Sequence, residues 1–98
     1  MACYFIGWID IEHPENRITY DQYIERVRPV VERYGGRYLI RSELIETFAG
    51  GWHPDRVIVI RFDDRKALGQ CFASPEYREI MDLRIRSVTT RAIITDGV

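Results

Sequence analysis

The fold is decided by residues 3–11, CYFIGWIDI, together with residues 56–62, RVIVIRF. Both stretches are rich in aromatic and β-branched residues and are bounded by polar or turn-forming residues, which predicts two strands. Apolar side chains occupy both alternating sets of positions: Phe5 and Ile9 lie on one face of the first strand and Trp8 lies on the other. An antiparallel strand with one solvated face alternates between apolar and polar residues. We therefore expect both strands to lie centrally in a sheet that is covered on both faces.

A helix is predicted after the first strand. Thr19 is the expected N-cap residue, and Gly35-Gly36 is expected to end the helix. Pro29 interrupts the pattern and predicts either a kink near Arg28 or two short consecutive helices. The residues that recur at steps of three and four, as on one helix face, are Tyr20, Tyr23, Ile24, Val27, Val31 and Tyr34.

The rest of the chain completes a β-α-β-β-α-β order, the arrangement of ferredoxin-like folds. Right-handed crossovers place the first and third strands at the centre of a four-stranded antiparallel sheet and the other two at its edges. The sequence thus predicts an α+β fold in a single domain, residues 1–98. The remaining predicted elements are a polar edge strand at 37–45, a turn at 47–55, a helix capped by Asp63 or Asp64 and restarted at Ser74-Pro75, and a last strand at 90–95.

The second face of this sheet needs a cover, because two helical segments can cover only one face. A second copy of the same sheet is the expected cover, since most oligomers are symmetric homodimers. The first and third strands, apolar on both faces, therefore predict a homodimer.

Composition and charge exclude several classes of protein. The 98 residues are 46% hydrophobic and 30% charged, as in ordinary globular domains, and the net charge of −1 argues against a nucleic-acid-binding protein. No apolar run approaches the ~18 residues of a membrane span, and the first residues do not resemble a signal peptide, so a cytoplasmic location is expected. Cys3 and Cys71 are far apart and are expected to be buried free thiols.

Several short motifs together resemble the domain-of-unknown-function 1330 family. They are Tyr20-x-x-Tyr23, Tyr34-Gly35-Gly36-Arg37, Arg41, Gly51-Trp52-His53-Pro54-Asp55-Arg56, Phe62 and Ser74-Pro75-Glu76-Tyr77. The resemblance runs from about Tyr4 to the C-terminus. It implies a ferredoxin-like protomer of the dimeric α/β-barrel superfamily, in which two sheets pack together. It implies no particular reaction.

The candidate catalytic residues are His53 and Tyr77. The pKa of histidine suits a general base at neutral pH, and Trp52 beside it is a candidate substrate-binding residue. Alternatively, His53 only supports a glycine-rich turn, because no orienting partner is visible near it. Tyr77 is expected to line a pocket between helix and sheet.

Three further residues are predicted to bind substrate: Tyr23, Arg41 and Arg84. All but one of the 14 basic residues are arginine, whose planar guanidinium suits carboxylates. Arg41 is expected on the same side of its strand as Arg37, where it clamps a carboxylate or instead pairs with Glu43 or Glu46. Arg84 lies two helical turns beyond Tyr77 on the same face, and Tyr23 is either a core residue or part of the pocket.

These observations leave three hypotheses for function. The first is an enzyme that acts without metal or cofactor on a small carboxylated or aromatic molecule, as related dimeric barrels include cofactor-independent monooxygenases and isomerases. The second is a non-catalytic dimeric module that binds or senses a small ligand. The third is a dimer without a ligand, which is favoured if no pocket of about 300 Å³ exists. No metal site is expected, because neither His13 nor His53 has a partner at ligand spacing.

Overall fold

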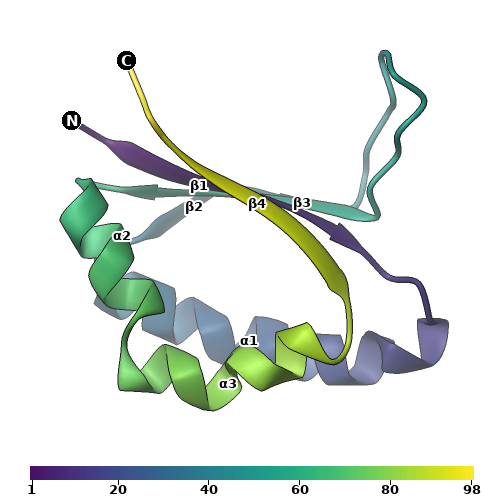
Figure 1. The fold of residues 1–98 in the computed structure, drawn as a ribbon, viewed down its shortest axis with the longest axis horizontal. Coiled ribbons are helices and arrows are strands. Elements are labelled where there is room, and N and C mark those ends of the chain that lie inside the picture. Colours follow the sequence, from purple (N-terminus) through teal and green to yellow (C-terminus); the bar gives the residue numbers. More distant parts are fainter.

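Strands and helices follow one another in the predicted order (Figure 1). The computed structural model describes residues 1–98 and shows four strands and three α-helices, with one turn of 3-10 helix before the first. Their bounds are β1 Cys3–Asp10, the 3-10 turn Pro14–Asn16, α1 Arg17–Arg33, β2 Arg37–Ser42, β3 Arg56–Phe62, α2 Arg65–Phe72, α3 Pro75–Ile85 and β4 Thr89–Asp96.

The four strands form one antiparallel sheet in the order β2-β3-β1-β4. The central position of β1 and β3 is therefore confirmed. Phe5 of β1 lies opposite Ile60 of β3 on one side and Ile94 of β4 on the other, so these three side chains share one face of the sheet.

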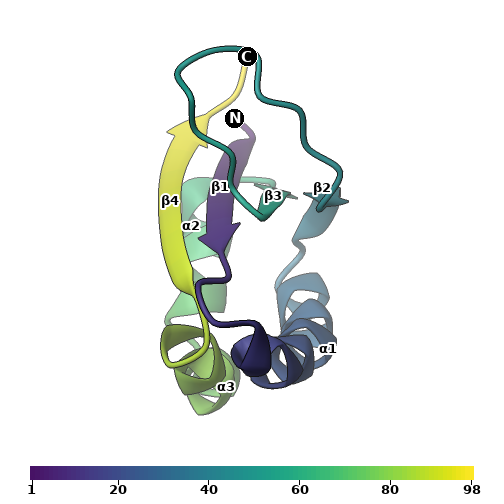
Figure 2. The ribbon, with the colours of Figure 1, turned by 90° about the vertical axis from the view of Figure 1, so that its right-hand side faces the viewer.

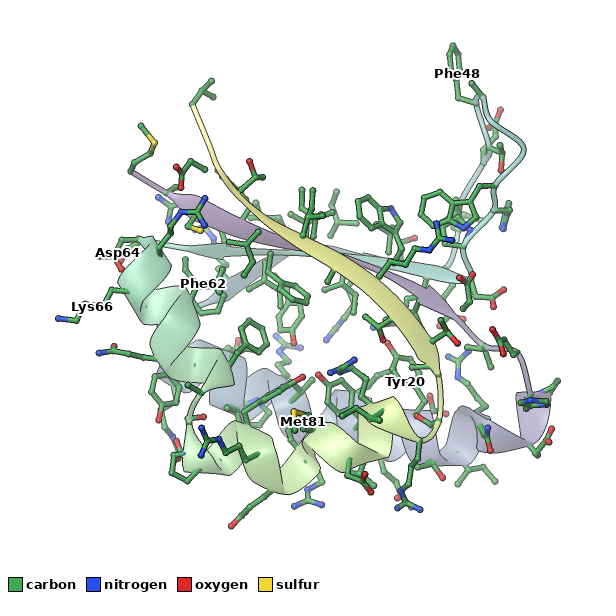
Figure 3. All side chains as sticks on the ribbon, in the orientation of Figure 1. Tyr20, Phe48, Phe62, Asp64, Lys66 and Met81 are labelled. Atoms are coloured by element: carbon green, nitrogen blue, oxygen red, sulfur yellow. The ribbon has the colours of Figure 1, made fainter.

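All three helices cover this one face, which we call the helix face (Figures 1 and 2). Side chains between the two layers are the most buried of the molecule: Cys3, Tyr20, Phe62 and Cys71 are 0% exposed. Tyr20 of α1 and Phe62 of β3 both point into the core between the helix layer and the sheet (Figure 3). Both cysteines are buried and free, as predicted.

The other side of the sheet, which we call the open face, has no element over it (Figure 2). Because directly opposite residues point to the same side, Ile6 of β1 shares this face with Val59 of β3 and Ile93 of β4. Ile93 is 51% exposed. An apolar open face is what the two-sided pattern of the central strands predicts.

Local sequence explains where α2 and α3 begin. The Asp64 carboxylate accepts a hydrogen bond from the Ala67 backbone N–H at 2.8 Å, so Asp64 rather than Asp63 is the cap. Ser74 Oγ accepts from the Tyr77 N–H at 3.1 Å, and Pro75 takes the first helical position. The restart predicted at Ser74-Pro75 is confirmed.

The first helix begins earlier than predicted, and one of the two alternatives predicted for its proline is wrong. It begins at Arg17 rather than after Thr19, because the 3-10 turn Pro14–Asn16 leads directly into it and Asn16 takes the cap position. It also runs unbroken through Pro29, so the two-helix alternative is wrong. Packing of the buried Val30 and Val31 beside the proline overrides its poor helix propensity.

A β-bulge in β2 corrects the predicted direction of Arg41. The pairing shifts by one residue between Tyr38 and Ile40, which leaves Leu39 as an extra residue. Arg37 consequently lies opposite Arg61 on the open face, while Arg41 lies opposite Ile58 on the helix face. The two arginines do not share a side of the strand. The strand also ends at Ser42, three residues earlier than predicted.

The loop between β2 and β3 rises away from the helices, beyond the open face (Figures 1 and 2). Phe48 lies at its tip, and both Phe48 and Leu44 are essentially fully exposed (Figure 3). At the base of the loop Trp52 packs against Trp8 of β1, with ring centroids 5.6 Å apart, and the Arg91 guanidinium lies over the Trp52 ring. None of the helices has the length and apolar character needed to cross a bilayer.

Candidate functional site

A mostly apolar groove opens on the helix face below the edge strand β4. It has a volume of about 450 Å³. It forms because α2 packs against β1 and β3, which leaves the helix-facing side of β4 uncovered; Ile94 there is 47% exposed. We call this the β4 groove. Its lining includes Phe5, Phe72, Tyr77, Met81, Arg84 and Thr90.

A chain of three polar side chains begins in this groove. The Arg84 Nε–H donates a hydrogen bond to Tyr77 Oη at 3.2 Å, and Tyr77 Oη lies 3.0 Å from Tyr23 Oη. A tyrosine hydroxyl can accept two hydrogen bonds and donate one. Tyr77 can therefore accept from both neighbours and still donate its own proton toward the groove.

Arg84 is the one charged side chain in the lining of the groove, and no carboxylate pairs with it. Burial opposes its charge, but the Tyr77 and Tyr23 hydroxyls more than offset this and keep the pKa of Arg84 above its ordinary value. The groove thus contains a partly buried guanidinium without a counterion. Such a group is costly unless an anion accompanies it.

Tyr23, which lies behind Tyr77 and Arg84, is not available as a base at neutral pH. Tyr23 is buried, and this burial, together with the neighbouring Tyr77 hydroxyl, raises the pKa of Tyr23 far above its ordinary value. Its phenol therefore keeps its proton at neutral pH. Tyr23 therefore supplies a hydrogen bond to Tyr77 and does not take up a proton there.

Three of the six predicted site residues, Tyr23, Tyr77 and Arg84, are thus brought together by α1 and α3. The signal for Tyr77 and Arg84 was their spacing of seven residues on one helix face. Phe72 and Thr90, which also line the groove, were not predicted as site residues. Their direction depends on how α2 and β4 are placed, which no local pattern reveals.

Arg41 lies on the helix face but away from the groove. Its guanidinium lies over the Tyr38 ring, 5.4 Å from the centroid. The alternative of an ion pair with Glu43 or Glu46 is wrong: Arg41 makes no ion pair, and the Glu43 carboxylate binds Arg17 and Arg56 instead. A role for Arg41 in binding a carboxylate stays a prediction.

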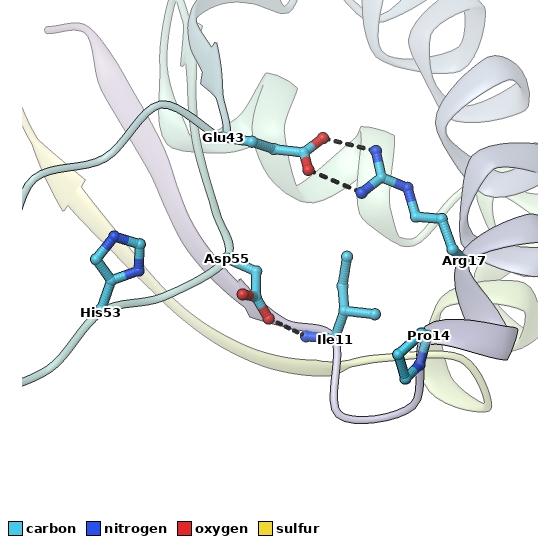
Figure 4. Close-up of a pocket in the computed structure, with 6 residues that line it drawn as sticks. All are labelled: Ile11, Pro14, Arg17, Glu43, His53 and Asp55. Atoms are coloured by element: carbon cyan, nitrogen blue, oxygen red, sulfur yellow. Dashed lines mark hydrogen bonds and ion pairs between the residues drawn. The ribbon is translucent and has the colours of Figure 1, made fainter.

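Trp52 and His53 belong to the loop, apart from the β4 groove. His53 lies beside a second, polar pocket of about 430 Å³ that Arg17, Glu43 and Asp55 also line (Figure 4). Its Nε2 lies 2.9 Å from the Ile45 carbonyl oxygen, and no side chain orients the ring. The predicted catalytic role of His53 stays a prediction. The structure places it in a different pocket from Tyr77.

The polar pocket contains an ion-pair network that sequence reasoning missed. Arg17 donates two hydrogen bonds to the Glu43 carboxylate, at 2.7 and 2.6 Å (Figure 4). Arg56 Nη1 donates to the same carboxylate at 3.3 Å. Arg56 is 7% exposed. An arginine at the start of an otherwise apolar strand was the only signal. No group of three or more His, Cys, Asp or Glu side chains is placed to hold a metal ion.

The family model described as domain of unknown function DUF1330 matches residues 2–98. The chain belongs to this family. None of the curated proteins matches this DUF1330 chain.

Solved structures show the same fold at low sequence identity. A protein of unknown function from Rhodopseudomonas palustris, RPA0582, is 20% identical with a TM-score of 0.82, and the match covers 99% of this chain and 82% of that one. A dimeric ferredoxin-like protein of unknown function from Jannaschia sp. CCS1 is 9% identical with a TM-score of 0.78, over 99% and 100% of the chains. SnoaB from Streptomyces nogalater, a cofactor-independent oxygenase, is 12% identical with a TM-score of 0.73, over 99% and 93%. The predicted family and the α+β ferredoxin-like fold are confirmed.

Proposed function

We propose that the β4 groove binds a small aromatic anion, and that the protein acts on this anion as an enzyme without a cofactor. The observation that carries the proposal is Arg84, a partly buried guanidinium with no carboxylate partner at the end of an apolar groove. Arginine binds carboxylates and other anionic oxygens through its planar set of donors.

The apolar part of the groove supports an aromatic ligand. The Phe72 ring packs edge-on against the Tyr77 ring at 5.0 Å, so a flat ring can add to an existing aromatic cluster. Met81 on α3 adds a flexible and polarizable side chain to the lining. A volume of about 450 Å³ lies within the usual range of small-molecule sites. The hypothesis of a dimer without a ligand, which the absence of such a pocket would favour, is therefore not favoured.

Arg84 and Tyr77 also support catalysis of one kind. Both can direct hydrogen-bond donors at one ligand oxygen, and fixed donors stabilise negative charge that develops on such an oxygen. Reactions of substrate enolates or phenolates need this stabilisation. Likeness of fold to SnoaB, itself a cofactor-independent oxygenase, is an analogy in the same direction.

A non-catalytic ligand-binding module is the second candidate. One observation favours it: no His, Asp or Glu lines the groove, and the phenol of Tyr23 stays protonated at neutral pH. Binding needs no proton acceptor. Catalysis in this groove would require that the substrate lose its proton in solution or transfer it to a water molecule.

The test is a thermal-shift screen of small aromatic carboxylates and phenols, followed by affinity measurements on variants. We expect Arg84→Ala to weaken binding at least tenfold and Arg84→Lys to weaken it less. Arg78→Ala is the matched control, because Arg78 is exposed on the same helix. Equal affinity of the Arg84→Ala and wild-type proteins for every ligand found would contradict the proposed site.

Turnover separates the two candidates. Product formation and oxygen uptake are measured with each ligand that binds, for wild type and Tyr77→Phe. Turnover that Tyr77→Phe slows supports the enzyme, whereas binding without turnover of any ligand identifies the protein as a binding module.

We further propose that the protein is a homodimer joined through the open faces of its sheets. The support is the exposed apolar surface that includes Ile6, Val59 and Ile93, together with the dimeric description of the Jannaschia protein. A cytoplasmic location and a catalytic role for His53 remain predictions.

A further inference from the structure

The loop between β2 and β3, residues 43–55, is braced across its two limbs, and we call it the β2–β3 arm. The His53 Nε2–H donates a hydrogen bond to the Ile45 carbonyl oxygen at 2.9 Å. Thr47 Oγ1 donates to the Trp52 carbonyl oxygen, also at 2.9 Å. Both contacts join the limb that leaves β2 to the limb that returns to β3. The arm therefore has a defined shape that does not depend on packing against the helix layer.

The base of the arm is anchored to the end of β1. The Asp55 carboxylate accepts a hydrogen bond from the Ile11 N–H at 2.6 Å, and the Asp55 N–H donates to the Ile9 carbonyl oxygen at 2.9 Å. Trp52 packs against Trp8 beside these contacts. The direction of the arm is thus fixed where it leaves the sheet, and it projects beyond the open face (Figures 1 and 2).

Two large apolar side chains are held in water by this arm. Phe48 at its tip is 102% exposed, and Leu44 is 96% exposed (Figure 3). Because the limbs are braced and the base is anchored, the arm does not fold back to bury them on its own protomer. Large apolar side chains that a protein holds away from its own core mark a surface that binds another protein.

A second copy of this chain over the open face lies within reach of the arm. Packed sheets are about 10 Å apart, so the partner's sheet would lie alongside the arm. The limb of residues 43–48 follows the last residue of β2, and six extended residues span up to about 20 Å. Both edge strands also offer an isoleucine on the open face: Ile40 of β2 is 45% exposed and Ile93 of β4 is 51% exposed. The partner thus presents apolar side chains at the height that the arm reaches.

We propose that the β2–β3 arm is a contact between two copies of this chain, in which Phe48 and Leu44 of each protomer are buried against the sheet of its partner. This inference rests on the proposed homodimer. A two-fold dimer contains the contact twice, once for each arm. His53 is a positioning residue in this arrangement, because its hydrogen bond to Ile45 holds the limb that carries both apolar side chains.

The rate of subunit exchange tests the contact, because changes at an interface act mainly on dissociation. Donor and acceptor dyes are attached to separate batches at Glu25→Cys on the exposed side of α1, since the natural Cys3 and Cys71 are 0% exposed. We expect Phe48→Ala to exchange at least tenfold faster than the otherwise unchanged protein, because each dimer loses two buried rings. Ile18→Ala, at an exposed position of α1, is the matched control and should exchange at the unchanged rate.

The positioning role of His53 has its own readout. His53→Leu removes the donor and should also speed exchange, whereas His53→Gln keeps an N–H donor and should restore most of the original rate. In the Phe48→Ala background His53→Leu should add little, because the two changes affect one contact. Equal effects of His53→Leu with and without Phe48 would show that the histidine does not act through the arm.

An isotope-filtered NOE experiment on dimers of one labelled and one unlabelled protomer detects the contact directly. We expect cross-peaks between the Phe48 ring and side chains of the other protomer, and none from Ile18. If the protein is a dimer but the Phe48 ring gives no such cross-peaks, or Phe48→Ala exchanges at the unchanged rate, the arm contact is refuted and the homodimer stands. A protein that is a single protomer throughout refutes both.

Discussion

Glu43 is the residue on which two arginines from different elements converge. Arg17 at the start of α1 and Arg56 at the start of β3 both donate to its carboxylate. The hydrogen bonds from Arg17 are the largest cause of a lowered pKa for Glu43, and Arg56 lowers it further. The network therefore joins the helix layer to the sheet at the end where the β2–β3 loop begins.

We predict that Glu43→Gln lowers the free energy of unfolding at pH 7 by about 1 kcal/mol, a modest value because the carboxylate is about a third exposed and solvent screens it. A lowered pKa in the folded state means that the stabilisation is full above the unfolded pKa of about 4.3 and is lost as the pH falls through the folded pKa. The difference between wild type and variant should therefore shrink below about pH 4.3.

Urea denaturation at a series of pH values measures this effect. Glu46→Gln is the matched control, because Glu46 is exposed and makes no ion pair. A difference between wild type and Glu43→Gln that persists unchanged at pH 3 would show that the carboxylate charge is not the cause.

At the residue scale, the sequence predicted the neighbours of a side chain best where both interacting residues lie on the same helix or strand. Tyr77 and Arg84 meet because they lie seven residues apart on α3, a distance that the helix repeat determines. The Tyr23–Tyr77 contact spans 54 residues of chain and two helices, so only the packed structure reveals it. Glu43 could not be assigned for the same reason, since both of its partners are remote in sequence.

Two glycines show how differently the elements of this fold tolerate a side chain. Gly36 lies between α1 and β2, where an added Cβ would come within 2.5 Å of Val31 Cγ1 and 2.8 Å of Phe62 Cζ. Gly69 lies inside α2, where an added Cβ would meet nothing within 4 Å. Gly36 thus lies where the core leaves no room for a side chain, whereas Gly69 lies in open space and only lowers the stability of α2.

We predict opposite effects of the same substitution at these positions. Gly36→Ala should lower the free energy of unfolding by about 1–3 kcal/mol, because it forces an atom into a filled core. Gly69→Ala should raise the same quantity by about 0.5–1 kcal/mol, because alanine is the better helix former. Denaturant unfolding of the two variants beside wild type is the measurement, and equal effects would contradict the packing described at Gly36.

At the scale of elements, sequence predicted the strands and the capped helices because hydrophobic period and cap residues are local signals. β3 was predicted to the residue, and the Ser74-Pro75 start of α3 was also correct. The bulge at Leu39 was missed, and the sequence left open whether Pro29 kinks or divides the first helix, because both features depend on pairing and packing with other elements.

At the scale of the whole molecule, the open face is the large apolar surface that a single protomer leaves without a cover. The helices leave it uncovered, and it presents the apolar side chains of both central strands to water (Figure 2). Patches of this kind mark interaction sites in soluble proteins. A second sheet would cover it with a surface of the same chemistry.

We predict that wild-type protein sediments as a dimer at micromolar concentration and that Ile6→Glu dissociates it, because a charge at the centre of the open face would be buried without a partner. Ile18→Glu is the matched control, since Ile18 is 73% exposed on α1, in the helix layer. A wild-type protein that sediments as one protomer would refute the homodimer.

The bulge residue Leu39 in β2 also determines where this chain can lose one residue and keep its fold. Pairing is regular on each side of Leu39. A one-codon deletion there would leave every later side chain of the strand on the face it already occupies, with Arg41 still over Tyr38. The same deletion within β3 would exchange the two faces of a central strand and expose its buried residues. A one-residue deletion that the edge of this sheet can accommodate would thus disrupt the core if it fell in a central strand.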